Sequence, residues 1–112
     1  MESDPNIEIK KPGYSIVIFS GRTAPMEETD DNIDVQVTMN DGRYYTATLF
    51  TLQNIHSMFD KNKLSGECDS GLYFSCPDMV IVERLNIDAV ERLVDHLMET
   101  RELETVFQAH IE

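Results

Sequence analysis

The sequence predicts an α+β fold: a mostly antiparallel sheet of about five strands with two helices packed on one face, or three if the segment after Thr100 forms its own helix. Short apolar stretches with a period of two indicate strands. Two longer stretches with the 3.6-residue period indicate helices, and tight turns separate them. The 112 residues, 41% of them hydrophobic, suit one core. We expect a loose N-terminal arm at residues 1–12 and a single α+β domain at 13–112.

Three strands are predicted before residue 51. The first, "YSIVIFS" at residues 14–20, is apolar on both alternating faces, as an interior strand is. The next two, "NIDVQVTM" and "RYYTATL", alternate apolar and polar residues, which gives the sheet one dry face and one partly wet face. The wet face is expected to present Gln36, Thr38, Tyr44, Thr46 and Thr48.

The "NDG" between the second and third strands admits two registers. A two-residue Asp-Gly loop would place Val37 beside Thr46 and mix the two faces. A three-residue loop with Gly42 in the left-handed conformation instead pairs Val37 with Tyr45 and keeps the apolar sets together. We therefore predict the three-residue loop, with Val35 opposite Ala47 and Ile33 opposite Leu49.

The segment "TLQNIHSMFDKNKLSGE" changes to the helical period. Thr51 is placed to cap the helix, and one face gathers its apolar residues: Leu52, Ile55, Met58 and Phe59. The stretches "GLYFSC" and "MVIVER", joined by "CPD", predict a second hairpin.

The most regular pattern follows Asn86, which is placed to cap a helix with an apolar stripe from Ile87 to Met98. Leu85 is positioned to pack against Val90. After residue 100 the apolar spacing thins, so a continuation of this helix and a second short helix both remain open.

The chain is strongly acidic. Its 21 Asp and Glu against nine Lys and Arg give a formal net charge of -12, which disfavours nucleic acid and anionic membrane surfaces and favours a basic protein partner. Acidity that serves solubility alone is the alternative. Five carboxylates fall within eight positions without a basic residue: Glu27, Glu28, Asp30, Asp31 and Asp34. We expect them in a mobile, exposed loop, where neutralising them would leave stability nearly unchanged.

No motif in the sequence indicates a catalytic site, a cofactor or a metal. Cys68 and Cys76 are eight residues apart and the histidines form no paired spacing, so we expect no zinc site and two reduced thiols. A calcium loop starting at Asp30 fails because Val35 occupies the position that needs glycine. The chain shows no signal-peptide pattern and no apolar run long enough to span a membrane, so we expect a cytoplasmic protein.

The stretches "TLQNI", "SGEC", "GLYF" and "DMVIVE", at residues 51–83, resemble a group of short uncharacterised bacterial proteins, with weaker similarity at "DVQVTMNDGRYYTATLF". This resemblance implies a common fold but no activity. In size and acidity alone, the chain resembles bacterial immunity or inhibitor proteins.

These patterns predict a non-enzymatic binding protein that covers a basic partner, most specifically a bacterial toxin whose active site binds nucleic acid. The expected partner-binding residues are the five carboxylates together with two residues of the wet sheet face, Tyr44 and Thr46. Two alternatives stay open: an enzyme or ligand-binding domain that uses residues 68–78, and a scaffold that homodimerises through its sheet.

Overall fold

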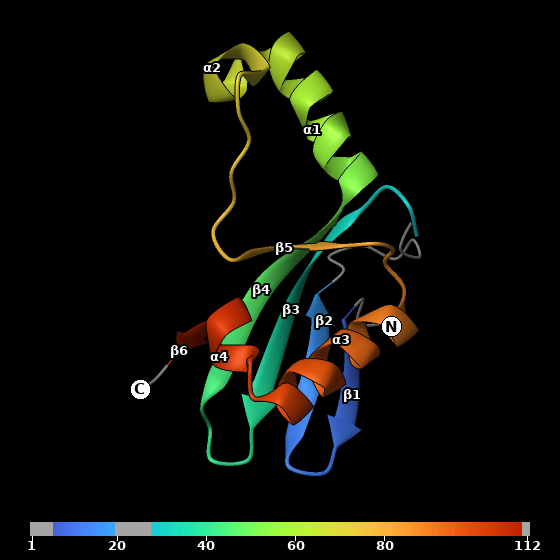
Figure 1. Cartoon of the computed structure of the whole chain (residues 1–112), viewed down its shortest axis with the longest axis vertical. Coiled ribbons are helices and arrows are strands. Elements are labelled where there is room, and N and C mark those ends of the chain that lie inside the picture. The colour runs from blue at the N-terminus through green and yellow to red at the C-terminus, as the bar shows by residue number, and fades with distance from the viewer. Residues whose placement is uncertain (1–5, 20–27, 111–112) are drawn as a thin grey trace, which may run out of the picture.

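The computed structural model describes residues 6–19 and 28–110, and these form one six-stranded sheet with helices (Figure 1). The strands are β1 (Ile7–Lys11), β2 (Tyr14–Phe19), β3 (Asn32–Met39), β4 (Tyr44–Thr51), β5 (Met79–Val82) and β6 (Gln108–His110). The helices are α1 (Leu52–Ser65), α2 (Glu67–Gly71), α3 (Ile87–Thr100) and α4 (Leu103–Val106). The strand order is β1-β2-β3-β4-β5, with β6 also paired to β4, and every pair except β4 with β5 is antiparallel. The predicted α+β class is confirmed.

Residues 7–11 are not a loose arm, which corrects the expectation for residues 1–12. They form β1, in which Ile7 and Ile9 stand opposite Ile18 and Ile16 of β2. A two-residue turn of Pro12 and Gly13 joins the strands, with Gly13 at a φ of 94°, a conformation that glycine adopts without a Cβ clash. The alternation "IEIK" before this turn is a strand signal, although the polar residues and the two prolines of residues 1–12 are typical of a loose arm.

The predicted register of β3 against β4 is confirmed. Val37 lies opposite Tyr45, Val35 opposite Ala47 and Ile33 opposite Leu49. A hydrogen bond from the Met39 N–H to the Arg43 carbonyl, at 2.8 Å, closes the three-residue loop, and Gly42 has a φ of 94°. The apolar side chains of both strands therefore share one face, as the period-two pattern requires.

The predicted second hairpin is wrong. Residues 72–78 form no strand, and β5 instead runs parallel to β4, with Thr48 beside Met79 and Thr51 beside Val82. Parallel strands need a long crossover connection, and here α1 and α2 supply it. The apolar run "MVIV" correctly indicated a strand, but an apolar run carries no information about which neighbour it will join.

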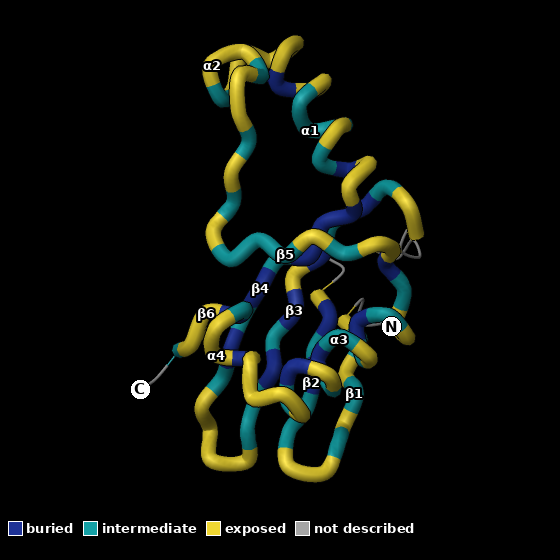
Figure 2. Tube along the Cα trace, in the orientation of Figure 1, coloured by how far each residue is buried: buried dark blue, intermediate teal, exposed yellow. Residues whose placement is uncertain are grey.

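The core lies between one face of the sheet and the helices α3 and α4, which cover it (Figures 1 and 2). Asn86 caps α3, since its Oδ1 accepts from the Ala89 N–H at 2.7 Å. Arg101, at a φ of 61°, ends α3. Of the two alternatives left open after residue 100, the structure therefore has the second short helix, α4. The buried core side chains of the helical layer are Leu85, Val90, Val94, Leu97, Leu103 and Phe107.

Two further features were not predicted. The chain returns from α4 into β6, which pairs with the first half of β4. In addition, α1 does not join the layer that covers the sheet: it continues beyond the end of β4 and, with α2, stands apart from the rest of the molecule (Figure 1). Among the described residues, no helix is both long and apolar enough to cross a membrane.

Candidate functional site

The acidic segment is tied to the start of α1 instead of hanging free. Asp31 is 5% exposed, its N–H donates to the Thr51 Oγ1 at 3.2 Å, and its carbonyl accepts from the Thr51 N–H at 3.1 Å. Its carboxylate accepts from the Asn32 N–H at 2.8 Å. The expected mobile, exposed loop is therefore wrong for Asp31.

Asp30 is also held by the first turns of α1. Its carboxylate accepts from the Asn54 Nδ2 at 3.0 Å and from the Ser57 Oγ at 3.3 Å, and Asn54 itself is buried. Thr51 caps the helix by accepting from the Asn54 N–H at 3.2 Å. Asn54 and Ser57, the partners of the Asp30 carboxylate, are thus neutral donors in the first turns of α1, where the positive end of the helix dipole also favours an acid.

The other predicted acids point elsewhere. Glu28 is exposed beside the start of α3, where its carbonyl accepts from the Leu85 N–H at 2.8 Å and its carboxylate from the Asn86 Nδ2 at 3.0 Å. Asp34 lies on the open face of the sheet and accepts from the Thr48 Oγ1 at 2.7 Å. Glu27 lies outside the described residues. The described acids of this run therefore do not form one patch.

The open face of the sheet brings three predicted residues near one another. Asp34 and Thr46 both line a cleft of about 290 Å³, which Phe19 and the 77–78 turn help to enclose. Thr46 Oγ1 is 2.7 Å from the Nε2 of His110, and the His110 ring stacks on Tyr44 with centroids 4.7 Å apart. Sequence reasoning missed His110 because the residues after 100 were assigned to a continued helix or a second short helix, with no signal for a returning strand.

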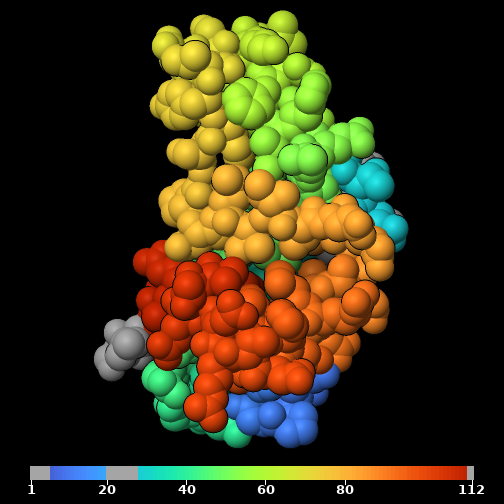
Figure 3. Space-filling model, in the orientation of Figure 1, coloured from blue at the N-terminus to red at the C-terminus, as the bar shows by residue number. Residues whose placement is uncertain are grey.

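Four of the seven exposed large hydrophobic residues of the described chain lie elsewhere, on the segment that we call the lobe, residues 52–78, comprising α1, α2 and the chain that leads to β5 (Figure 3). Leu64 is 91% exposed and Leu72 is 73% exposed, and Leu52 and Tyr73 are also largely in water. The lobe shows little of the dark blue that marks buried residues in the sheet and α3 (Figure 2). The helical stripe of α1 was expected to enter the core, whereas the residues that α1 buries are Asn54 and Asn62.

Close backbone packing shapes the lobe. Gly71, at a φ of 80°, approaches α1 so closely that a Cβ there would lie 2.6 Å from the Lys63 Cγ and 3.0 Å from the Phe59 carbonyl oxygen. Just before it, Cys68, Asp69 and Ser70 all have φ values from 52° to 55°, a left-handed turn that costs L-residues free energy. The chain thereby reverses against α1 and places Leu72 and Tyr73 near its far end, on the surface.

Three groups with shifted pKa values, Lys11, Tyr14 and Asp95, belong to a network that joins the β1–β2 hairpin to α3. Partial burial and a hydrogen bond to Asp95 raise the pKa of Tyr14 to about 12. Burial acts to raise the pKa of Asp95, but hydrogen bonds from Tyr14 and Lys11 outweigh it and leave that pKa below its usual value. Hydrogen bonds to Glu91, at 2.5 Å, and to Asp95 raise the pKa of Lys11. This arrangement stabilises the packing of α3 and does not border the cleft on the open face.

Neither cysteine is paired, and both are half-buried. Among the described residues, no three His, Cys, Asp or Glu side chains gather closely enough to hold a metal ion. Comparison with protein-family models, curated proteins and solved structures finds no match to the chain. The resemblance of residues 51–83 to short bacterial proteins therefore stays a prediction.

Proposed function

We propose that the chain is a small acidic binding protein without catalytic activity, and that its partner is a basic protein. The observation that carries this proposal is the lobe, where large apolar side chains stand in water on an element that projects from the core. Large apolar side chains that gather in water on one segment are typical of interaction sites in folded proteins. Leu64, Leu72 and Tyr73 are the anchors that the partner would cover.

Charged residues surround these anchors in the sequence and on the exposed surface of the lobe. Asp60, Glu67 and Asp69 are exposed, and the two lysines of the lobe are already near acids: Lys61 lies 3.7 Å from Glu67 and Lys63 lies 4.0 Å from Asp60. An apolar centre with a polar rim is the usual anatomy of a protein interface. The chain's net charge of -12 would speed encounter with a basic partner.

In its most specific form, the proposal is an immunity-type inhibitor of a basic bacterial toxin. Carboxylates can occupy the phosphate positions of a site that binds nucleic acid. Glu28 and Asp34 remain exposed for that role, whereas Asp30 and Asp31 are engaged with α1. The acidic run alone is therefore not the proposed contact surface, and the lobe supplies its apolar part.

A second candidate is a ligand-binding domain, favoured by the cleft on the open face of the sheet. Asp34, Thr46 and Thr48 offer polar groups there, and Pro77 and Asp78 from the end of the lobe complete one side. A ligand that protects these residues, with no effect of lobe substitutions, would favour this candidate.

The proposal is tested by cross-linked capture of partners from the native host, with three forms of the chain as bait. The wild type should retain a basic protein, and the triple variant Leu64→Ser, Leu72→Ser, Tyr73→Ser should retain it at least about tenfold less. The control is Ile87→Ser, which removes an exposed apolar side chain from α3 instead. Equal capture by all three forms, or a captured protein that is not basic, would overturn the proposal.

A further inference from the structure

The strand β5 has one paired edge and one free edge. It pairs with β4 through residues 79–82, and among the described residues no other strand pairs with it. Main-chain N–H and C=O groups along a free edge form a template to which an extended chain can add. β5 is short, but it is not covered by a helix lying along its outer side (Figure 1).

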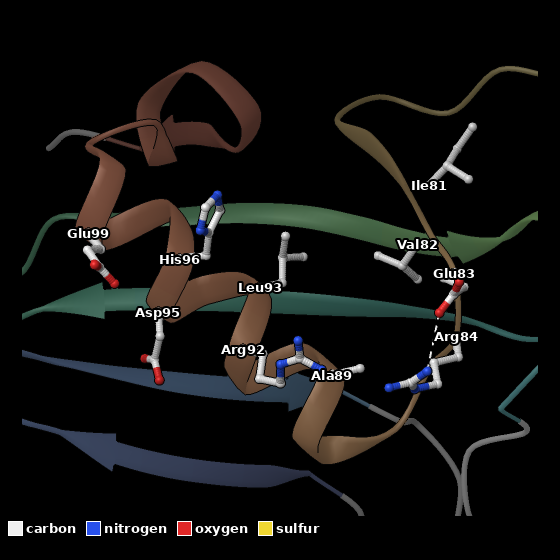
Figure 4. A pocket seen from close by; sticks show the side chains of 10 residues that line it. All are labelled: Ile81, Val82, Glu83, Arg84, Ala89, Arg92, Leu93, Asp95, His96 and Glu99. Carbon is white, nitrogen blue, oxygen red and sulfur yellow. Dashed lines mark hydrogen bonds and ion pairs between the residues drawn. The ribbon is translucent and has the colours of Figure 1, made fainter.

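A groove of about 620 Å³ runs between β5 and α3 (Figure 4). Consecutive residues of the strand and its extension, Ile81, Val82, Glu83 and Arg84, all line it. Ile81 and Val82, the last two residues of β5, point to opposite faces, and because both line the groove, it passes along the main chain at this end of the strand. Since the other edge is occupied by β4, the groove borders the free edge.

The opposite wall is one face of α3. Ala89, Leu93 and His96 follow one another at spacings of four and three residues, which places them on the same side of the helix, and they face the groove in Figure 4. Ile81, 54% exposed, adds an apolar side chain from β5. The groove therefore offers alternating apolar contacts beside unpaired main-chain groups.

The groove wall carries both signs of charge, with Glu83, Asp95 and Glu99 against Arg84 and Arg92. Arg84 lies 3.2 Å from Glu83, and Asp95 is engaged by Lys11 at 3.0 Å. Arg92 is exposed and, among the described residues, makes no ion pair. A carboxylate on the occupant would find its partner there.

We propose that this groove binds an extended peptide segment of a partner protein, which adds as a strand to the free edge of β5 and sets an acidic residue against Arg92. Main-chain hydrogen bonds to β5 supply affinity, and alternate apolar side chains between Ile81 and Leu93 supply specificity. The groove is separate from the lobe, so this inference does not rest on the proposed function. A second copy of the chain is a less suitable occupant, because two molecules of charge -12 repel each other.

The probe is a displayed library of random twelve-residue peptides, selected on the full-length chain. Enriched sequences should alternate β-branched or aromatic residues with polar ones and carry an Asp or Glu at a fixed position. A synthetic peptide of that sequence should bind the wild type and lose about tenfold in affinity with Arg92→Glu. The matched control Lys10→Glu reverses an exposed cation on β1 and should leave peptide binding within about twofold.

A second variant, Ala89→Trp, fills the groove and should also abolish binding. Circular dichroism and the unfolding temperature establish whether each variant is folded. If Ala89→Trp does not fold, the test rests on Arg92→Glu, which changes an exposed position of α3. Hydrogen exchange of the wild type with bound peptide should slow at residues 79–83. The proposal is overturned if no sequence is enriched, if the selected sequences have a helical period, if protection falls outside β5, or if sedimentation shows a second copy occupying this edge.

Discussion

Asp30 is an acid whose position depends on neutral donors. Its carboxylate accepts from the buried Asn54 amide and from Ser57, so its removal leaves a buried donor without that acceptor. We predict that Asp30→Ala lowers the free energy of unfolding by about 1 to 3 kcal/mol. Asp34→Ala, which removes an exposed carboxylate bonded to Thr48, should change it by less than about 0.5 kcal/mol. Urea unfolding measures both, and equal effects would contradict the assigned role of Asp30.

Tyr14 gives the fold an alkaline sensitivity. Its pKa of about 12 in the folded chain exceeds the ordinary value of 10.0, because burial and the hydrogen bond to Asp95 favour the neutral phenol. The folded state therefore binds the proton more tightly, and the stabilisation, fully present below pH 10, is lost as the pH rises from about 10 toward 12. Tyr14→Phe should flatten that part of the stability profile.

Urea midpoints measured between pH 8 and 12 test this prediction. Tyr73→Phe, which alters an exposed ring on the lobe remote from Asp95, is the control. Some slope should remain in Tyr14→Phe, because burial and a hydrogen bond to Glu104 also raise the pKa of Tyr45. A slope equal to that of the wild type would contradict the role of Tyr14.

At the scale of elements, close approach of Gly71 to α1 determines how the lobe folds. An added Cβ would meet the Lys63 Cγ at 2.6 Å and the Phe59 carbonyl at 3.0 Å, and the φ of 80° is also unfavourable for alanine. Gly66 has a similar φ of 86° but open space around it. We predict that Gly71→Ala costs about 1 kcal/mol more than Gly66→Ala.

The two glycine variants share the backbone penalty, so their difference isolates the steric contact. Hydrogen exchange should show faster exchange at the end of α1 in Gly71→Ala. Equal stability and equal exchange would show that α2 does not pack against α1 in solution.

Elements with a strong local signal were predictable, and those defined by distant partners were not. The register of β3 with β4 follows from a period of two and a glycine-ended turn, and α3 follows from a cap and a continuous stripe. The parallel partner of β5 and the return of β6 depend on contacts far apart in sequence, which no local pattern encodes. For α1, the helical period correctly gave the helix, but a period cannot say whether the apolar face meets the core or solvent.

At the scale of the whole molecule, the chain divides into a body that contains the core and a lobe that does not. The core cluster includes no residue of the lobe. The lobe carries four carboxylates and two lysines, a net charge of -2 within the total of -12, so most of the charge belongs to the rest of the chain. The lobe, with about a quarter of the residues, carries about a sixth of the net charge, so it is only somewhat less acidic per residue than the rest of the chain.

This division predicts where a protease will cut first. Residues 72–76 lack regular structure, and Leu72 and Tyr73 are exposed, whereas Tyr45 and Phe107 are buried. Brief digestion with chymotrypsin under native conditions should cleave in the lobe before it cleaves in the body. Mass spectrometry of the first fragments gives the answer, and initial cuts within β3, β4 or α3 would contradict the division.

The candidate site was predictable only in part because, as with β5 and β6, some of its contacts join residues that are far apart in the sequence. Asp34 and Thr46 share the open face because strand alternation places them there. Asp30 and Asp31 were assigned to a surface patch because a run of like charges indicates solvent exposure. Nothing in that run reveals that the Asn54 amide donates to Asp30, or that the Asp31 main chain bonds to Thr51 at the start of α1. Leu52 was assigned to the apolar face of a helix and Leu72 to a strand, and neither pattern indicates the exposure that both have.

The most direct test of the binding role of the lobe is hydrogen exchange of the chain alone and in complex with its captured partner. We predict that the largest slowing on binding falls between residues 58 and 74, around Leu64, Leu72 and Tyr73, with little change along α4 and β6. Covered anchors lose contact with water, and the amides near them open less often to exchange in the complex. Slowing confined to the open face of the sheet or to α3, with the lobe unchanged, would contradict the assignment of the lobe as the partner-binding surface.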